Sequence, residues 1–345
     1  MRSSTSSSNP HMRIDANFGL SVTFAVVLFI VFVACFELGL RMSGIDHISV
    51  TDDMALWSMQ REKIDKAQDT SNMVVLLGGS RMQLGFSSKA FRETYPDKGL
   101  VRLGISGAKP IAALKDIAEN TGFQGVVLMA VYVPAISLSH IKAQQPYIDY
   151  YLKNWSFDKR LNRQIKLFLE ERFVSQNPRY GFLKYVKGVV NPKRELTTHY
   201  LTIERDRSNY ADYSMVPREK LEKSIRKRKK VFVKQQPRDQ KDAQIWLAGT
   251  VPVEEMVKKI TDRGGRVVFI RFPNGYDLWQ QTHGKLYPNN LFWDAYAKQS
   301  RADFIHFADY QALHFDSPDG SHIDMKDIDA FTLNLLEVLK NKGLM

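Results

Sequence analysis

Cysteine is nearly absent from this 345-residue chain, in which Cys35 is the only one. A single cysteine cannot form an intrachain disulfide, and it argues against thiolate metal sites and cysteine nucleophiles. The chemistry of the protein is therefore expected to depend on other side chains, and we expect no metal and no cofactor.

Two widespread motifs are also missing. Ser80 follows two glycines, but Met82 stands where the lipase-type Gly-x-Ser-x-Gly elbow needs its last glycine. The pair Gly78-Gly79 is not followed by Gly-Lys-Ser or Gly-Lys-Thr, so a phosphate-binding loop is absent as well.

Charge is missing from residues 18–36, an unbroken apolar run rich in Val, Phe and Leu. About 20 apolar residues suffice to cross a bilayer. Arg2 and Arg13 precede the run, and acidic residues follow it, although Arg41 lies on the far side too. By the positive-inside rule, we expect residues 1–17 to form a cytoplasmic tail and residues 18–40 a single-pass anchor of the inner membrane. The bulk of the chain would then be periplasmic or otherwise extracytoplasmic.

Two alternatives to a retained anchor remain open. The apolar run could belong to a cleaved signal peptide. The tetrapeptide Phe32-Val33-Ala34-Cys35 also resembles a lipoprotein cleavage box, although Phe32 fits it poorly.

The rest of the chain predicts an α/β fold. Short apolar segments, expected to be buried parallel strands, alternate with helical patterns. The expected strands are Met73–Leu77, Leu100–Leu103, Val126–Val131, Arg266–Phe272 and Asp303–Phe307. The expected helices are Ser88–Thr94, Ile111–Asn120, Val253–Arg263, Asn290–Ser300 and Asp327–Lys340, with Gly264-Gly265 as a stop signal. This alternation indicates a parallel sheet covered by helices on both faces, formed by residues 71–135 and 246–345. Residues 41–70 are expected to be a juxtamembrane stalk with a short helix near 55–67.

Residues 136–245 interrupt the alternation and are expected to form a basic, mainly helical insertion or cap. They hold 25 Lys and Arg against 12 Asp and Glu, whereas the remainder is nearly neutral. The densest basic segment is 220–234, and aromatic residues such as Tyr150, Trp155, Tyr180, Phe182 and Tyr185 accompany it in the insertion. The segment is interpreted either as a solvated helix face or as a contact with an anionic glycan or a membrane surface. Nucleic acid is not expected as a partner, because the anchor places this surface outside the cytoplasm.

Three residues suggest nucleophilic catalysis. Ser80 follows the first expected strand, and the turn Asp319-Gly320-Ser321-His322 precedes the last expected helix. A serine becomes a useful nucleophile when a histidine takes its proton and a carboxylate orients that histidine. The alternatives are a helix N-cap for Ser80 and a metal site formed by His322 with the aspartates at 316, 319 and 324.

These segments resemble the blocks of the SGNH (GDSL-type) hydrolases and acyltransferases. Gly78-Gly79-Ser80 is similar to the Gly-Asp-Ser block, with Gly79 in place of Asp, and Asp319-x-x-His322 is similar to the last block. Leu103-Gly104-Ile105-Ser106-Gly107 resembles the second block, which implies that Gly107 and Ser80 donate backbone N–H groups to an oxyanion hole. The third block, Gly-x-Asn-Asp, has no match, because Tyr132-Val133-Pro134-Ala135 follows the third expected strand.

The resemblance implies a three-layer α/β/α sandwich with Ser80 as nucleophile, His322 as base and Asp319 as its orienting acid. It covers residues 70–135 and 245–345. Membrane-anchored relatives of this kind resemble alginate O-acetylation proteins and the D-alanine transfer protein of teichoic acids, which act beside a membrane-bound O-acyltransferase. The resemblance therefore implies acyl transfer, of acetyl above all, or ester hydrolysis on an extracytoplasmic polysaccharide.

Arg81, Arg271 and Tyr132 are the predicted substrate-binding residues. Arg81 follows the nucleophile and Arg271 ends the fourth expected strand, so both are placed to face the same crevice and bind an acidic group; a structural ion pair is the alternative. Tyr132 is a candidate for the donor that the missing asparagine would supply. The histidines at 283, 306 and 314 are interpreted as surface or packing residues.

The sequence leaves a different class of function open: a catalytically inactive scaffold or a glycan-binding subunit. A crevice filled by side chains, or a Ser80 lying far from His322, would indicate this alternative.

Overall fold

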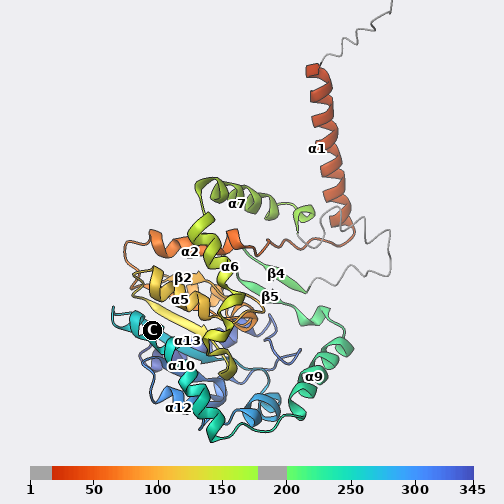
Figure 1. The fold of residues 1–345 in the computed structure, drawn as a ribbon. Helices are drawn as coiled ribbons and strands as arrows, with labels where there is room; N and C mark the ends of the chain where they lie inside the picture. Colours follow the sequence, from red (N-terminus) through yellow and green to blue (C-terminus); the bar gives the residue numbers. More distant parts are fainter. Residues whose placement is uncertain (1–17, 178–199) are drawn as a thin grey trace, which may run out of the picture.

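The computed structural model describes residues 18–177 and 200–345. A long N-terminal helix, α1 (Phe18–Met42), extends from an α/β body (Figure 1). Within the described part of the chain, α1 is the one helix long and apolar enough to cross a membrane. The apolar run is thus a helix, and its role as an anchor stays a prediction.

Five parallel strands form the central sheet, in the order β2-β1-β3-β6-β7. Their bounds are β1 (Met73–Leu77), β2 (Gly99–Arg102), β3 (Val126–Ala130), β6 (Arg266–Arg271) and β7 (Asp303–His306). The predicted α/β class with a central parallel sheet is confirmed, and each strand agrees with its predicted bounds to within one residue. Because β2 and β3 lie on opposite sides of β1, the strand order reverses there, where a site is expected in such sheets.

Apolar side chains cover both faces of the sheet. Val75 and Leu77 belong to one buried cluster and Val74 and Leu76 to the other, because successive strand residues point to opposite faces. Helices of the first cluster are α2 (Met54–Lys66), α5 (Ile111–Asn120), α10 (Gln240–Thr261) and α12 (Trp293–Ala297). Helices of the second cluster are α3 (Ser80–Gly85), α4 (Ser88–Thr94) and α13 (Ile328–Asn341).

The segment predicted as a stalk packs into the body instead. Helix α2 starts at an N-cap, Asp53, whose carboxylate accepts the N–H of Leu56 at 2.9 Å. Trp57 is fully buried in the core, and Arg61 pairs with the buried Asp116 of α5 at 2.5 Å. The charged composition that suggested a stalk thus includes charges that are buried and paired.

Two helices differ in length from the prediction. Helix α10 begins at Gln240 rather than Val253, after a capping box in which Asp239 and Asp242 each accept the other's N–H. It runs through Pro252 and ends ahead of Gly264, whose φ of +94° fits the predicted stop. Helix α12 is shorter than the predicted 290–300.

The insertion is spread over the body rather than gathered into one cap. Helix α6 (Gln145–Asn154) packs on α2 and α5, and α7 (Phe157–Glu170) packs on α2. Strands β4 (Leu201–Ile203) and β5 (Asn209–Ala211) form an antiparallel pair, and helix α9 (Arg218–Val233) has no buried residue. Tyr180, Phe182 and Tyr185 lie outside the described residues.

Short helical segments make up the other elements of the described residues: η1 (Val133–Ala135), η2 (Leu138–Ala143), η3 (Val174–Gln176), η4 (Tyr213–Met215), α11 (Tyr276–Trp279), η5 (Gln280–Gly284), η6 (Phe307–Asp309) and η7 (Gln311–Leu313).

Candidate active site

Ser80, His322 and Asp319 form a continuous chain of hydrogen bonds. Ser80 Oγ lies 2.8 Å from Nε2 of His322, and Nδ1 of His322 lies 2.9 Å from Oδ2 of Asp319. With the Nδ1–H donated to the carboxylate, Nε2 carries the lone pair that accepts the serine hydroxyl. The fold thus joins residues that are 242 positions apart into the arrangement that the sequence predicted.

Ser80 stands where β1 turns into α3, after two glycines that the turn requires. A Cβ on Gly78 would lie 2.6 Å from the Cβ of Met82, so no larger residue fits without a shift of the backbone. Gly79 is the N-cap of α3, and the Ser80 hydroxyl bonds to His322 rather than to the helix. The interpretation of Ser80 as an N-cap is therefore wrong.

The position of Gly79 also explains the departure from the Gly-Asp-Ser pattern. A Cβ there would lie 2.9 Å from the carbonyl oxygen of Ala108, in the loop that follows β2. That loop is held to the nucleophile turn by a hydrogen bond from the Ile105 N–H to the Gly78 carbonyl at 2.9 Å. Glycine at position 79 lets the loop carrying Gly107 approach this closely.

Both carboxylate oxygens of Asp319 have partners that hold the side chain in place. Oδ1 accepts the N–H groups of Ser321 and His322 at 2.9 Å each, while Oδ2 faces the His322 ring and lies 3.3 Å from Arg228. Burial alone would raise the pKa of Asp319. Its hydrogen bonds to His322 and the charges of His322 and Arg228 outweigh burial and lower that pKa to about 2. Asp319 is thus a carboxylate at neutral pH, as an orienting acid must be.

An open cavity of about 410 Å³ lies beside Ser80. The nucleophile turn, the loop after β2 and the ends of β3 and β6 line one part of it, and helix α9 lines another through Arg228, Val231 and Phe232. Ser80, Arg81, Gly107 and Tyr132 all line this cavity, as their places after strand ends predicted. A crevice of this size is not filled by side chains, so an acyl group and part of its carrier have room beside the serine.

Backbone N–H groups near Ser80 are available to an oxyanion. Ser80 is the first residue of α3, where helix N–H groups have no partner within the helix. Gly107 has a φ of +76°, which presents its N–H from a tight loop, and a Cβ there would meet open space. Within the described residues, neither N–H donates to a protein acceptor. Both N–H groups are therefore free to donate, and their role in an oxyanion hole stays a prediction.

Tyr132 lies two residues beyond the end of β3. Its ring lies 5.8 Å from the Arg81 guanidinium and 5.9 Å from the Lys109 ammonium, and His283 packs edge-on against it. The contacts of Tyr132 are thus those of an aromatic platform for two cations.

Asn274 is a cavity residue that the sequence analysis missed. It follows the Arg271-Phe272-Pro273 segment at the end of β6, it is buried, and its Oδ1 accepts a hydrogen bond of 3.4 Å from Arg271. With Oδ1 turned to Arg271, its amide N–H₂ is left as a donor. Its place after a strand end, beside β3, was the one signal that could have identified it.

The cavity wall is positively charged. Arg81, Lys109 and Arg228 line it, and no carboxylate lines it in the described part of the chain. Burial and the neighbouring Arg228 lower the pKa of Arg81 to about 10, and burial lowers the pKa of Lys109. With basic side chains and no carboxylate in its lining, the cavity favours an anionic group.

Arg271 differs from its prediction. It is buried behind Tyr132 and His283 and lines a small adjoining cavity of about 10 Å³ rather than the main one. Its side chain donates to the Phe272 carbonyl and to Asn274, and burial and then Arg81 hold its pKa well below the usual range. In this structure Arg271 positions Asn274 and does not itself reach the open crevice.

The remaining histidines have packing environments, but one of them also lines the site. His314 stacks on Tyr276, and His306 is buried, with its pKa lowered to about 3 by burial and then Arg271. His283 contacts Phe232 and Tyr132 and lines the cavity, and burial and then nearby arginines lower its pKa to about 2. His283 is therefore an uncharged residue in the wall of the cavity, and the sequence did not indicate this position.

Across residues 18–177 and 200–345, the structure contains no group of three or more His, Cys, Asp or Glu side chains placed to hold a metal ion. Comparison of the chain with protein-family models, with curated proteins and with solved structures finds no match. The geometry of the site therefore carries the functional argument by itself.

Proposed function

We propose that this protein is a serine-dependent acyltransferase or esterase of the SGNH type, acting on an acylated, negatively charged extracytoplasmic polysaccharide. The observation that carries the proposal is the Ser80–His322–Asp319 chain, with contacts of 2.8 and 2.9 Å, opening on a cavity of about 410 Å³. A sheet with buried helix clusters on both faces supports a three-layer sandwich as the fold.

The first half-reaction forms an acyl-enzyme. Ser80 Oγ attacks the carbonyl carbon of the donor ester while its proton moves to Nε2 of His322. The N–H groups of Ser80 and Gly107 stabilise the oxyanion, and Asn274 is our candidate for the third donor. Collapse of the tetrahedral intermediate breaks the bond to the donor alcohol, which leaves with the proton held by His322.

The second half-reaction reverses these roles. A sugar hydroxyl, or water, gives its proton to His322 and attacks the acyl carbon on Ser80. Collapse of the second intermediate returns the proton to Ser80 Oγ and releases the new ester or the free acid. Asp319 remains ionised throughout, because its pKa of about 2 lies far below neutral pH.

Charge on the cavity wall supports an acidic substrate. Arg81, Lys109 and Arg228 line the cavity, and α9 continues away from it as a basic helix without buried residues. A polymer with carboxylates or phosphates would reach the serine along segment 220–234, which is how we interpret the anionic-glycan contact predicted there.

Helix α1 supports a location at a membrane. The inner membrane, with the body on the extracytoplasmic side, is our proposal from the positive-inside rule. Acyl groups for a polysaccharide must reach that side from the cytoplasm, so a polytopic membrane-bound O-acyltransferase is the proposed partner. In this arrangement the partner supplies the acyl group that is carried through Ser80.

A catalytically inactive scaffold or glycan-binding subunit is the second candidate, favoured by the absence of the third-block asparagine. The short Ser80–His322 contact and the unfilled cavity count against it. Asn274 also lines this cavity, and its amide is our candidate for the donor that the third-block asparagine would supply.

Hydrolysis of p-nitrophenyl acetate by the purified full chain separates the two candidates. We expect wild-type turnover above the rate of the uncatalysed reaction, and loss of that excess in both Ser80→Ala and His322→Ala. Equal rates for the wild type and both variants would contradict catalysis at Ser80, and the inactive-scaffold candidate would then lead.

A further inference from the structure

Helix α7 exposes an apolar face that the proposed reaction does not explain. Phe157, Leu161, Ile165 and Phe168 are 73%, 45%, 54% and 50% exposed, and Leu169 joins them at the same side. Their spacing of three and four residues places them in one stripe along the helix. A row of large apolar side chains in water is unusual for a helix on the surface of a soluble body.

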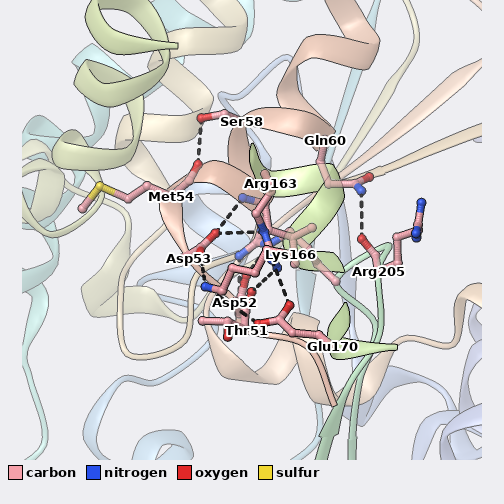
Figure 2. A network of polar contacts seen from close by, with 12 residues as sticks. Thr51, Asp52, Asp53, Met54, Ser58, Gln60, Arg163, Lys166, Glu170 and Arg205 are labelled. Carbon is pink, nitrogen blue, oxygen red and sulfur yellow. Dashed lines mark hydrogen bonds and ion pairs between the residues drawn. The ribbon is translucent and has the colours of Figure 1, made fainter. Parts of the chain in front are cut away.

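The opposite face of α7 is turned toward the body, where one apolar residue, Leu167, is buried beside charged side chains. Arg163 and Glu170 are buried and paired at 2.8 Å, and Arg163 also donates to the Thr51 carbonyl at 2.7 Å. Lys166 reaches Asp53 at 3.2 Å (Figure 2). Apart from Leu167, charged side chains face inward here and large apolar ones outward, the reverse of the arrangement that packs most helices onto a soluble core. The ion pairs fix which face points away.

The same helix lies next to the end of the apolar helix α1. Glu37 of α1 accepts the N–H groups of Val174 and Ser175 at 2.8 and 2.9 Å, in the turn just after α7. Arg41 of α1 donates to the Arg172 carbonyl at 3.2 Å. In Figure 1, α7 runs crosswise to α1 and beside its C-terminal end. A helix α1 standing across a bilayer would therefore leave α7 lying along the bilayer surface.

We propose that α7 is an in-plane membrane helix whose face of Phe157, Leu161, Ile165 and Phe168 inserts into the headgroup–acyl boundary of the leaflet from which α1 emerges. Helices of this kind bury their apolar face about 5–10 Å into that boundary. The Arg172 guanidinium lies 3.7 Å from the centroid of the Phe168 ring, at the rim of the stripe, where a cation can reach lipid phosphates while its stem stays apolar.

This assignment gives the body a fixed orientation on the membrane. Two elements, α1 and α7, contact the bilayer, and hydrogen bonds of Glu37 and Arg41 join α1 to residues 172–175, just after α7. The proposal depends on α1 spanning the membrane and is independent of any chemistry at Ser80.

Spin labels on the full chain in lipid nanodiscs test the proposal. The variant Ile165→Cys, in a Cys35→Ala background, reports on α7. The variant Ile245→Cys of α10, in the same background, is the matched control, because Ile245 is an isoleucine 66% exposed on another helix. The native Cys35, labelled in the wild type, reports on α1, in which it is exposed. The readout is the ratio of collisions with oxygen, which enters lipid, to collisions with a water-soluble nickel chelate.

We expect the collision ratio at position 165 to exceed that at position 245 several-fold and to approach that of Cys35. A ratio at 165 equal to that at 245, with Cys35 in lipid, would overturn the proposal and leave the stripe to a protein partner or a second copy of the chain. A water-like ratio at Cys35 would overturn it too, by removing α1 from the membrane. An unchanged thermal unfolding temperature in the two cysteine variants shows that the labels report on the native fold.

Discussion

Replacing Asp319 by asparagine isolates the electrostatic part of the triad. Oδ1 of Asp319 accepts two backbone N–H groups, so the amide oxygen of an asparagine would take that place and its N–H₂ would face His322. An N–H₂ group there donates to Nδ1 and forces the proton onto Nε2, which can then no longer accept the proton of Ser80. We expect kcat to fall about 10³- to 10⁴-fold, equivalent to about 4–5.5 kcal/mol of transition-state stabilisation.

The same substitution should also lower the stability of the protein. The pKa of Asp319 falls from 3.8 to about 2 in the folded state, and its side chain is 14% exposed. A shift of this size corresponds to about 1–2.5 kcal/mol that the ionised carboxylate adds to the free energy of unfolding. Because the folded pKa is lowered, this contribution is present above pH 4 and is lost as the pH falls toward 2. The difference between the wild type and Asp319→Asn should therefore shrink over that interval.

Asp324→Asn is the matched control, since Asp324 is a buried residue of the same loop whose carboxylate, among the residues that the structure describes, accepts only the Lys326 N–H, at 3.3 Å. The assay combines p-nitrophenyl acetate turnover with urea unfolding at pH 7 and at low pH. A loss in Asp319→Asn no larger than the loss in Asp324→Asn would refute the argument that Asp319 sets the tautomer of His322.

Three further predictions concern the cavity and the core. Asn274→Ala should lower kcat about 100-fold with little change in KM, as expected for an oxyanion donor, and equal kcat values would rule that role out. Arg81→Gln should raise KM about tenfold for an ester that carries a carboxylate and leave KM for a neutral ester unchanged; an equal effect on both esters would contradict charge recognition. Arg61→Met leaves Asp116 buried without its ion-pair partner and should lower the free energy of urea unfolding by about 3–5 kcal/mol, whereas a change below 1 kcal/mol would contradict the packing of α2 into the body.

The sheet and the triad were accessible from the sequence because local patterns determine them. Short apolar segments between helical patterns give buried parallel strands, and the carboxyl ends of such strands meet at one edge. Ser80, Gly107 and Tyr132 each follow such an end, and all three line the cavity. The order of Ser80 and the Asp319–His322 turn along the chain then predicted a triad whose geometry this fold provides.

The remaining features depend on long-range packing, which composition does not reveal. Arg271 ends a strand as predicted, but its side chain turns behind Tyr132, so Asn274 and not Arg271 lines the open cavity. Residues 41–70 were predicted to be a stalk because they are rich in charge. The sequence does not show that Arg61 forms an ion pair with Asp116, 55 positions away. Periodicity shows that α7 has an apolar face, but only the ion pairs of Arg163 show that this face points outward.

Covalent labelling of Ser80 reports whether His322 activates its hydroxyl group. The full chain would be treated with a fluorophosphonate, which reacts with an activated serine, and the modified peptide would be located by mass spectrometry. We predict one adduct on Ser80 in the wild type and a large loss of labelling in His322→Ala. The reason is that Nε2 of His322, 2.8 Å from Ser80 Oγ, accepts the hydroxyl proton. Absence of an adduct on Ser80 in the folded wild type, or equal labelling in His322→Ala, would contradict it.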